Sequence, residues 1–401
     1  MKILFLHRNF PGQFRYLAPD LAKDSNNEVV FITNAHNGQI PGVKKYEYNL
    51  KREVPANCHR YLRFYEECII HGQSSAEIAL QLKNSGFYPD IIYGHTWGQT
   101  LFMKDVFPKS KLVGYFEWFF NSENSYLDFG NREVNIDERA KYRIDNSQLY
   151  VDLNICDAGL CPTNYQVKQF PLLYRDKIKV LHDGIDTDFC IRKDDASLKI
   201  PDKNIILTKN DEVLTYGTRG MDPYRGFPEF MRAVEILQKK RPNMHVIISG
   251  KDRVCYGPPL PNGKTYKQKM LEELDLDLNR IHFTGLLPFD NFVDMLNISS
   301  AHVYLTYPFV CSWSLLNAMA CETPIIASNT EPVLEFLEND KNALLCDFFD
   351  VEEQVAKIEY ALDNRDKMEP LRKAARKTIV DNYALKDLLP QHIAYLKSLL
   401  D

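Results

Sequence analysis

The chain has 401 residues, more than one hydrophobic core usually serves, so two domains are expected. Its 45% hydrophobic and 26% charged residues are ordinary for a globular protein, and a net charge of −5 argues against a protein that coats nucleic acid. Nine scattered cysteines without CxxC spacing predict reduced thiols in the cytoplasm. No stretch approaches the roughly 20 apolar residues of a membrane span, which leaves peripheral attachment open.

Strands and helices alternate along the N-terminal half. The opening MKILFLHRNF is apolar over too few residues for a signal peptide and predicts a strand at 2–6, followed by a Pro-Gly loop and a helix at 14–23. Further strands are predicted at 29–33, 90–94, 111–115, 159–162 and 177–181. Further helices are predicted at 59–85, 99–106, 140–156 and 164–170. The aromatic and Asn-rich residues 117–135 predict an irregular loop.

The pattern restarts after a polar connector at 182–202. Strands are predicted at 213–216, 245–249, 282–284, 302–306 and 324–327. Helices are predicted at 265–274, 289–297, 314–321 and 331–338, and the end is helical over 351–400 with breaks near Asn364 and Asn382. Alternation of β and α twice over predicts two doubly wound parallel sheets, in an N-terminal domain at 1–185 and a C-terminal domain at 200–383.

The stretch VLTYGTRGMDPYRGFPEFMRAVEIL at 213–237 predicts a strand, a glycine-rich loop and a helix. This arrangement presents backbone N–H groups and the positive end of a helix to an anion. The loop also carries Arg219 and Arg225, and two guanidiniums beside a helix start suit a diphosphate. The alternative is that each arginine is a solvated loop residue, but the pair inside this loop favours phosphate.

Several motifs, in order, resemble the retaining GT-B glycosyltransferases of the bacterial glycosyl transferase group 1 family, of the family 4 type. HDGIDTDFC at 182–190 resembles the Asn-Gly-Val-Asp linker, and LLNAMACETPIIASN at 315–329 resembles the Leu-Glu-Ala-Met-Ala-x-Gly-x-Pro-Val signature. GTRGMDPYRG places Arg219 and Arg225 at the Arg and Lys positions of the Gly-Arg…Lys-Gly loop. The resemblance implies an α/β GT-B architecture, in which two Rossmann-like domains face each other across a cleft and the segment 384–401 completes the N-terminal domain.

The same resemblance implies a nucleoside-diphosphate sugar as donor substrate and no separate cofactor. Its diphosphate would meet the two arginines and a helix start that Ser312 and Ser314 can cap. Gly12, in HRNFPGQFRYLAP, would approach the donor phosphates, and the acceptor would bind near Trp97 and residues 117–130. The remaining donor-binding positions that the resemblance implies are Gly250, Lys251, Leu287, Phe309, Trp313, Leu315 and Asn317.

Two positions depart from the family. Its two glutamates fall on Phe309 and Asn317, and its N-terminal-domain histidine falls near Glu117. His95, at the end of another predicted strand, is a rival for the same role, with a packed histidine as the equal alternative. Glu117 lies among aromatic residues, where a carboxylate is desolvated unless it points to solvent. We therefore count Arg219, Arg225, Glu117 and His95 as candidate catalytic residues.

The resemblance implies a retaining, metal-independent transferase in the cytoplasm, with a glycan, lipid-linked glycan, metabolite, protein or hydroxylated DNA base as acceptor. The alternatives are a non-catalytic homologue that binds a nucleotide sugar or a partner enzyme, and a phosphorylase or sugar-phosphate epimerase. The DxD at Asp186 and Asp188 lies in the linker motif and predicts a turn rather than a metal site. The basic stretch 367–377 predicts a solvated helix face, with contact to an anionic membrane as the lesser alternative.

Overall fold

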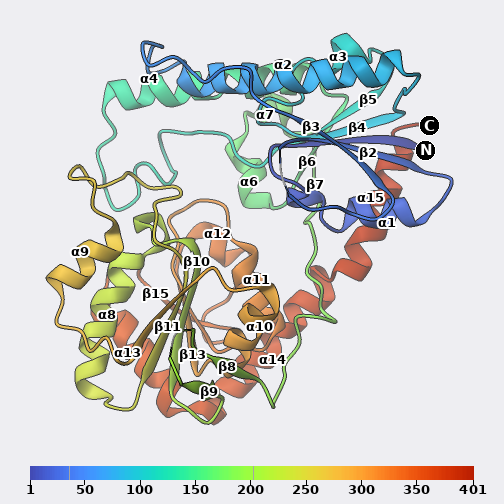
Figure 1. Ribbon diagram of the computed structural model, residues 1–401. Coiled ribbons are helices and arrows are strands. Elements are labelled where there is room, and N and C mark those ends of the chain that lie inside the picture. Colours follow the sequence, from blue (N-terminus) through green and yellow to red (C-terminus); the bar gives the residue numbers. More distant parts are fainter. Residues whose placement is uncertain (36, 202) are drawn as a thin grey trace. The chain divides into compact units, whose positions relative to one another are not determined.

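A computed structural model describes residues 1–35, 37–201 and 203–401 (Figure 1). Asp202, the last residue of the predicted connector, lies outside the described residues. The chain divides into two compact units. The first contains Met1–Gly184 and Lys386–Asp401, and the second contains Ile185–Leu385. Both are α/β units built on parallel sheets, as the sequence predicts for a doubly wound fold.

The first unit has a seven-stranded parallel sheet in the order β3-β2-β1-β4-β5-β6-β7. Its strands are β1 (Lys2–His7), β2 (Glu28–Asn34), β3 (Val43–Tyr48), β4 (Ile91–His95), β5 (Lys111–Tyr115), β6 (Ala158–Cys161) and β7 (Ile178–Val180). Its helices are α1 (Leu17–Lys23), α2 (Arg63–Asn84), α3 (Met103–Val106), α4 (Ile136–Asp145), α5 (Ser147–Ile155), α6 (Asn164–Gln169), α7 (Leu172–Arg175) and α15 (Leu385–Ser398). The interior strand β1 is apolar because both of its faces are covered.

The C-terminal helix α15 packs on the core of the first unit. Leu388 and Leu396 are buried there beside strands β1, β2 and β4, and His392 Nε2 lies 3.0 Å from the carbonyl oxygen of His182. The helix begins at Leu385 and continues through Pro390. Leu400, which follows the helix, is exposed.

The second unit has a six-stranded parallel sheet in the order β12-β11-β10-β13-β14-β15 and a small antiparallel pair, β8-β9. Its strands are β8 (Ser197–Lys199), β9 (Ile206–Thr208), β10 (Val213–Gly220), β11 (His245–Lys251), β12 (Ile281–Gly285), β13 (Ala301–Tyr304), β14 (Ile325–Ser328) and β15 (Leu344–Cys346). Its helices are α8 (Phe227–Lys240), α9 (Tyr266–Glu273), α10 (Phe289–Ile298), α11 (Trp313–Ala320), α12 (Glu331–Leu334), α13 (Val351–Asp363) and α14 (Arg365–Asn382). Figure 1 shows α8 and α13 on one side of this sheet and α10 and α11 on the other.

The structure differs from the sequence predictions mainly at edges and ends. The edge strands β3 and β15 and the pair β8-β9 were not predicted, because VKKYEY is mostly polar and the others span only three residues each. The helix predicted at 140–156 is divided into α4 and α5 at Asn146. The side chain of Asn146 hydrogen-bonds both the N–H and the carbonyl of Phe120, which ties the break to the 117–135 loop. The helices predicted at 59–85, 99–106 and 331–338 are shorter than expected.

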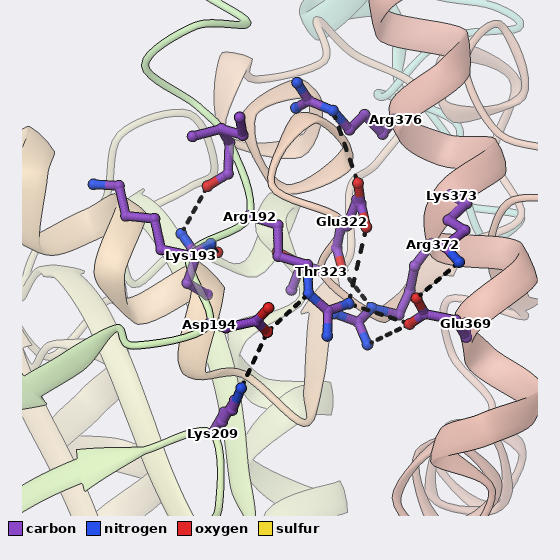
Figure 2. A network of polar contacts seen from close by, with 12 residues as sticks. Arg192, Lys193, Asp194, Lys209, Glu322, Thr323, Glu369, Arg372, Lys373 and Arg376 are labelled. Carbon is purple, nitrogen blue, oxygen red and sulfur yellow. Dashed lines mark hydrogen bonds and ion pairs between the residues drawn. The ribbon is translucent and has the colours of Figure 1, made fainter.

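The basic stretch 367–377 lies on α14, and its arginines and lysines behave differently. Lys373 and Lys377 are exposed, as the solvated-face interpretation predicts. The side chains of Arg372 and Arg376 turn toward the protein, so that interpretation is wrong for them (Figure 2). Arg372 donates to the carbonyl of Glu322, and Arg376 donates to the carbonyls of Thr187, Cys190 and Ala320. These bonds tie the connector to the carboxyl end of α11.

We expect Arg376→Ala to lower the free energy of unfolding by about 3 kcal/mol, because three carbonyls lose a charged donor. Lys377→Ala is the matched control. Lys377 is the next residue, is exposed and, within the described part of the chain, pairs with Asp381 alone, so its loss should change stability by no more than about 0.5 kcal/mol. Thermal unfolding of the two variants measures the difference. Equal melting temperatures would show that the Arg376 bonds do not hold the connector.

Candidate functional site

The glycine-rich loop of the second unit brings both predicted arginines to one pocket. Arg219 is exposed near the end of β10, and Arg225 is buried at the end of the short 3-10 turn Pro223–Arg225. Gly226 follows in the left-handed region, with φ of 68°, and a Cβ there would meet Leu305. Helix α8 begins directly after this turn. The pocket is lined by Tyr216, Gly217, Thr218, Arg219, Arg225, Tyr256, Val303, Tyr304, Leu305, Ser312 and Ser314.

The two arginines differ in how many hydrogen bonds their guanidinium groups make to the rest of the protein. Arg225 donates from Nη1 to Thr306 Oγ1 at 2.6 Å and to Tyr304 OH at 3.3 Å, and from Nη2 to the carbonyl of Val310 at 2.8 Å. It therefore holds the segment after β13 in place as well as facing the pocket. Among the residues that the structure describes, no hydrogen bond or ion pair reaches the Arg219 side chain. Arg219 is thus the cation in this pocket that is available to a ligand.

Helix α11 begins at the same pocket. The side chain of Ser312 caps it by accepting from the N–H of Ser314, and the Ser312 N–H donates to Tyr304 OH at 2.8 Å. A capped helix start carries partial positive charge, which favours an anion beside the two arginines. Trp313 packs partly against the core, and Leu315 is fully buried. Asn317 is also buried, with Cys190 Sγ 3.5 Å from its Oδ1. Trp313, Leu315 and Asn317 are not among the residues that line the pocket.

A buried carboxylate that the sequence did not single out organises the other wall. Asp222 is fully buried and accepts from the backbone N–H groups of Tyr224, Cys255, Tyr256 and Gly257, at 2.6 to 3.2 Å. These bonds fix the loop after β11 so that the Tyr256 ring lies 4.9 Å from the Arg225 guanidinium. Asp-Pro marks a turn start in the sequence, but its pairing with 255–257 is a long-range contact that local patterns do not reveal.

Phe309 and several other predicted donor positions are outside the lining of this pocket. The Phe309 ring lies 5.4 Å from the Tyr256 ring, and its backbone N–H donates to the carbonyl of Tyr307. Gly250 has φ of 157° and passes close to the Thr218 carbonyl, where a Cβ would approach to 2.7 Å. Lys251 is exposed beside it, and Leu287 packs against the core. Gly250, Lys251 and Leu287 are not among the residues that line the arginine pocket.

The candidate residues of the first unit also gather in one place, at the carboxyl ends of β1, β4 and β5. His95 is buried, and its Nε2 lies 3.3 Å from Glu117 Oε2. Gln13 Nε2 lies 3.5 Å from the other carboxylate oxygen of Glu117. Gly12 has φ of 56°, and a Cβ there would collide with the His7 ring. Parallel sheets bind ligands at this end of their strands, which is where these residues are brought together.

His7, which the sequence did not mark as a site residue, connects Gly12 and Gln13 to this cluster. Its Nδ1 accepts from the N–H of Asn9, which leaves Nε2 to donate to Gln13 Oε1 at 2.7 Å. Burial and the neighbouring His95 lower the pKa of His7 to about 3, so the ring stays neutral near pH 7. Gln13 is therefore oriented with its amide N–H toward Glu117. Trp97, a predicted acceptor contact, has its ring centroid 4.3 Å from that of His95.

The Asp-x-Asp motif is a turn, as predicted. Asp186 Oδ1 accepts from the N–H groups of Asp188 and Phe189. The described residues hold no group of three or more His, Cys, Asp or Glu side chains placed to bind a metal ion. Among the same residues, no helix has both the length and the apolar character needed to cross a membrane.

Models of two glycosyltransferase families match successive parts of the chain. Residues 25–190 match the glycosyl transferase family 4 group, and residues 199–378 match glycosyl transferases group 1. A search of curated proteins gave no match.

Several solved structures share this fold at low sequence identity. Sucrose-phosphate synthase from Thermosynechococcus elongatus is 13% identical, with a TM-score of 0.71 over 100% of this chain and 99% of that one. Anabaena HepE in complex with UDP-glucose is 15% identical, with a TM-score of 0.71 over 99% and 100%. A glycosyltransferase from Rickettsia africae is 17% identical, with a TM-score of 0.62 over 100% and 98%. With its fold, its motifs and both family matches, this chain belongs to the GT-B glycosyltransferases of the glycosyl transferase group 1, family 4 type.

Proposed function

We propose that this protein transfers a sugar from a nucleoside-diphosphate sugar to an acceptor hydroxyl, with retention of anomeric configuration and without a metal ion. The observation that carries the proposal is the pocket shared by Arg219, Arg225 and the start of α11. Negative charge develops on the diphosphate as the sugar leaves, and preorganised cations and helix N–H groups stabilise that charge. Guanidinium groups suit this task because they remain charged at any working pH.

In the proposed reaction the bond between the anomeric carbon and the β-phosphate oxygen breaks, and the acceptor oxygen bonds to that carbon on the same face. The acceptor proton passes to the leaving phosphate oxygen, so the products are a glycoside and a nucleoside diphosphate. Arg219 would supply most of the new stabilisation, because no described residue hydrogen-bonds or pairs with its guanidinium group. In the first unit, Glu117, held beside His95 and Gln13, would accept hydrogen bonds from sugar or acceptor hydroxyls.

The test is a panel of UDP, GDP, ADP and dTDP sugars, in which hydrolysis or transfer is measured by the release of the nucleotide. Anabaena HepE was solved with UDP, UDP-glucose and glucose, which supports starting with UDP sugars. NMR of the product determines whether the anomeric configuration is retained. Activity that survives EDTA is expected. An absolute requirement for a divalent ion, or an inverted product, would overturn the corresponding part of the proposal.

A second candidate is a non-catalytic homologue, which the residues at the two usual glutamate positions favour. Phe309 cannot accept a hydrogen bond, and Asn317 is buried and not among the residues that line the pocket. Binding of a nucleotide sugar without turnover over the whole donor and acceptor panel would support it. A phosphorylase or epimerase would instead require inorganic phosphate or no acceptor. The panel therefore includes inorganic phosphate beside glycan, lipid-linked glycan, small-metabolite, protein and hydroxylated-DNA acceptors.

We expect the donor sugar to lack a hydroxyl where Phe309 lies. A hydroxyl pressed against that ring would lose its water partners without replacement, which disfavours the substrate. A pentose or deoxy sugar should therefore exceed the matching hexose in kcat/KM by about tenfold or more. Phe309→Glu should shift the preference toward the hexose. Clear preference of the unaltered enzyme for UDP-glucose would show that this ring does not face the sugar.

A further inference from the structure

Two adjacent leucines on the surface of the first unit have almost no protein contact. Leu172 and Leu173 on α7 are 78% and 84% exposed, whereas most leucines of this chain belong to its cores. Phe170, two residues earlier, is fully buried in the core of the same unit. A neighbouring pair of leucines held in water is costly at roughly 25 cal/mol per Å², and such exposed apolar groups mark contact surfaces.

The turn that carries the leucines is held rigidly outward. Arg175 donates from Nε to the carbonyl of Phe170 at 2.7 Å and from Nη2 to the carbonyl of Lys168. Lys177 donates to the carbonyl of Leu153 at 2.7 Å, which fastens the far side of the turn to α5. Tyr174 packs beside the half-exposed Tyr150, with ring centroids 6.4 Å apart. Because both ends of the turn are fixed, the leucines cannot fold back onto the core.

The surroundings of the pair are basic, in contrast to the whole protein. Residues 168–179 contain four cations and one acid, while the chain carries a net charge of −5. Lys168 and Lys179 are exposed, and Lys179 lies 4.5 Å from the Tyr395 ring of α15. Each cation near an anionic bilayer contributes attraction, and apolar groups that enter the headgroup region supply the second signal that stable peripheral binding needs.

We propose that the turn at 168–179 is a membrane-docking surface, on which Leu172 and Leu173 insert into an anionic lipid surface and the exposed Lys168 and Lys179 face lipid phosphates. This surface takes the place of the basic stretch of α14 as the membrane contact, because the arginines of α14 are turned into the protein (Figure 2). The proposal does not depend on the donor or on turnover. It places the enzyme at a membrane whether its acceptor is in the lipid or beside it.

The test is co-sedimentation of the full chain with vesicles of phosphatidylcholine alone and of phosphatidylcholine mixed with phosphatidylglycerol. Binding is expected only to the mixed vesicles and should weaken as salt is raised. The double variant Leu172→Ser/Leu173→Ser should bind at least about tenfold more weakly with an unchanged melting temperature. Lys168→Gln/Lys179→Gln should weaken binding and reduce its dependence on salt.

The matched control is Leu278→Ser/Leu334→Ser, which alters two leucines of the second unit that are 52% and 50% exposed. It should bind vesicles as the unaltered protein does. Failure of the unaltered protein to sediment with the mixed vesicles would overturn the proposal, as would equal binding by the Leu172/Leu173 variant. Equal binding to phosphatidylcholine alone would overturn the role of charge. A dimer that the Leu172/Leu173 variant converts to a monomer, without vesicle binding, would assign the surface to a second copy instead.

Discussion

Arg219→Ala should lower turnover by about a hundredfold while leaving the protein folded. That factor corresponds to about 3 kcal/mol, the typical loss when one preorganised charge-assisted contact to a transition state is removed. The fold should be unaffected because the structure shows no hydrogen bond or ion pair from the Arg219 side chain to any other described residue. Steady-state kinetics with the preferred donor, together with the melting temperature, measure both parts of this expectation.

Arg225→Ala provides the contrast within the same pocket. Its removal takes donors from Tyr304, Thr306 and Val310, so both stability and turnover should fall. Arg232→Ala is the matched control for a lost surface charge. Arg232 is on α8 and is partly exposed, and among the described residues its ion pair is with Glu229, so its loss should leave turnover nearly unchanged. Turnover of Arg219→Ala near that of the control would remove this residue from the catalytic machinery.

The sequence predicted the architecture because its strongest signals are local and repeated. Short apolar runs alternate with amphipathic helices, and each such pair is one unit of a doubly wound sheet, so even rough boundaries define the fold class. The failures are elements whose stability comes from neighbours. Strand β3 has a polar sequence and forms by pairing along β2, and α4 separates from α5 because Asn146 binds the backbone of Phe120.

The arginines and capping serines of the candidate site could be predicted from the sequence, and its other residues only in part. Arg219, Arg225, Ser312 and Ser314 stand at fixed offsets within one loop and one helix start, and all four line the same pocket. The sequence could not show which arginine is already hydrogen-bonded to the protein, because the partners of Arg225 are about 80 residues away in the chain. His7 was missed for a similar reason, because its link to Glu117 passes through Gln13.

Asp222→Asn should disorder the loop over the arginine pocket and weaken nucleotide binding. The carboxylate of Asp222 is fully buried and accepts four backbone N–H groups, three of them from residues 255–257. An asparagine replaces one acceptor oxygen by an NH₂ group, which then faces other donors, so bonds are lost and donors are left unsatisfied. We expect a loss of about 3 kcal/mol in the free energy of unfolding.

The decisive measurement is amide hydrogen exchange at Cys255, Tyr256 and Gly257, which should become much faster in Asp222→Asn while the sheet amides of β10 stay protected. Tyr256 would then leave its position over Arg225, and the dissociation constant for UDP or the preferred nucleotide should rise. Asp252→Asn is the matched control, because Asp252 is an exposed carboxylate at the start of the same loop. If the loop amides remain protected in Asp222→Asn, Asp222 is not what holds Tyr256 in the pocket wall, and the wall must be fixed by packing of the aromatic rings of Tyr256 and Phe309.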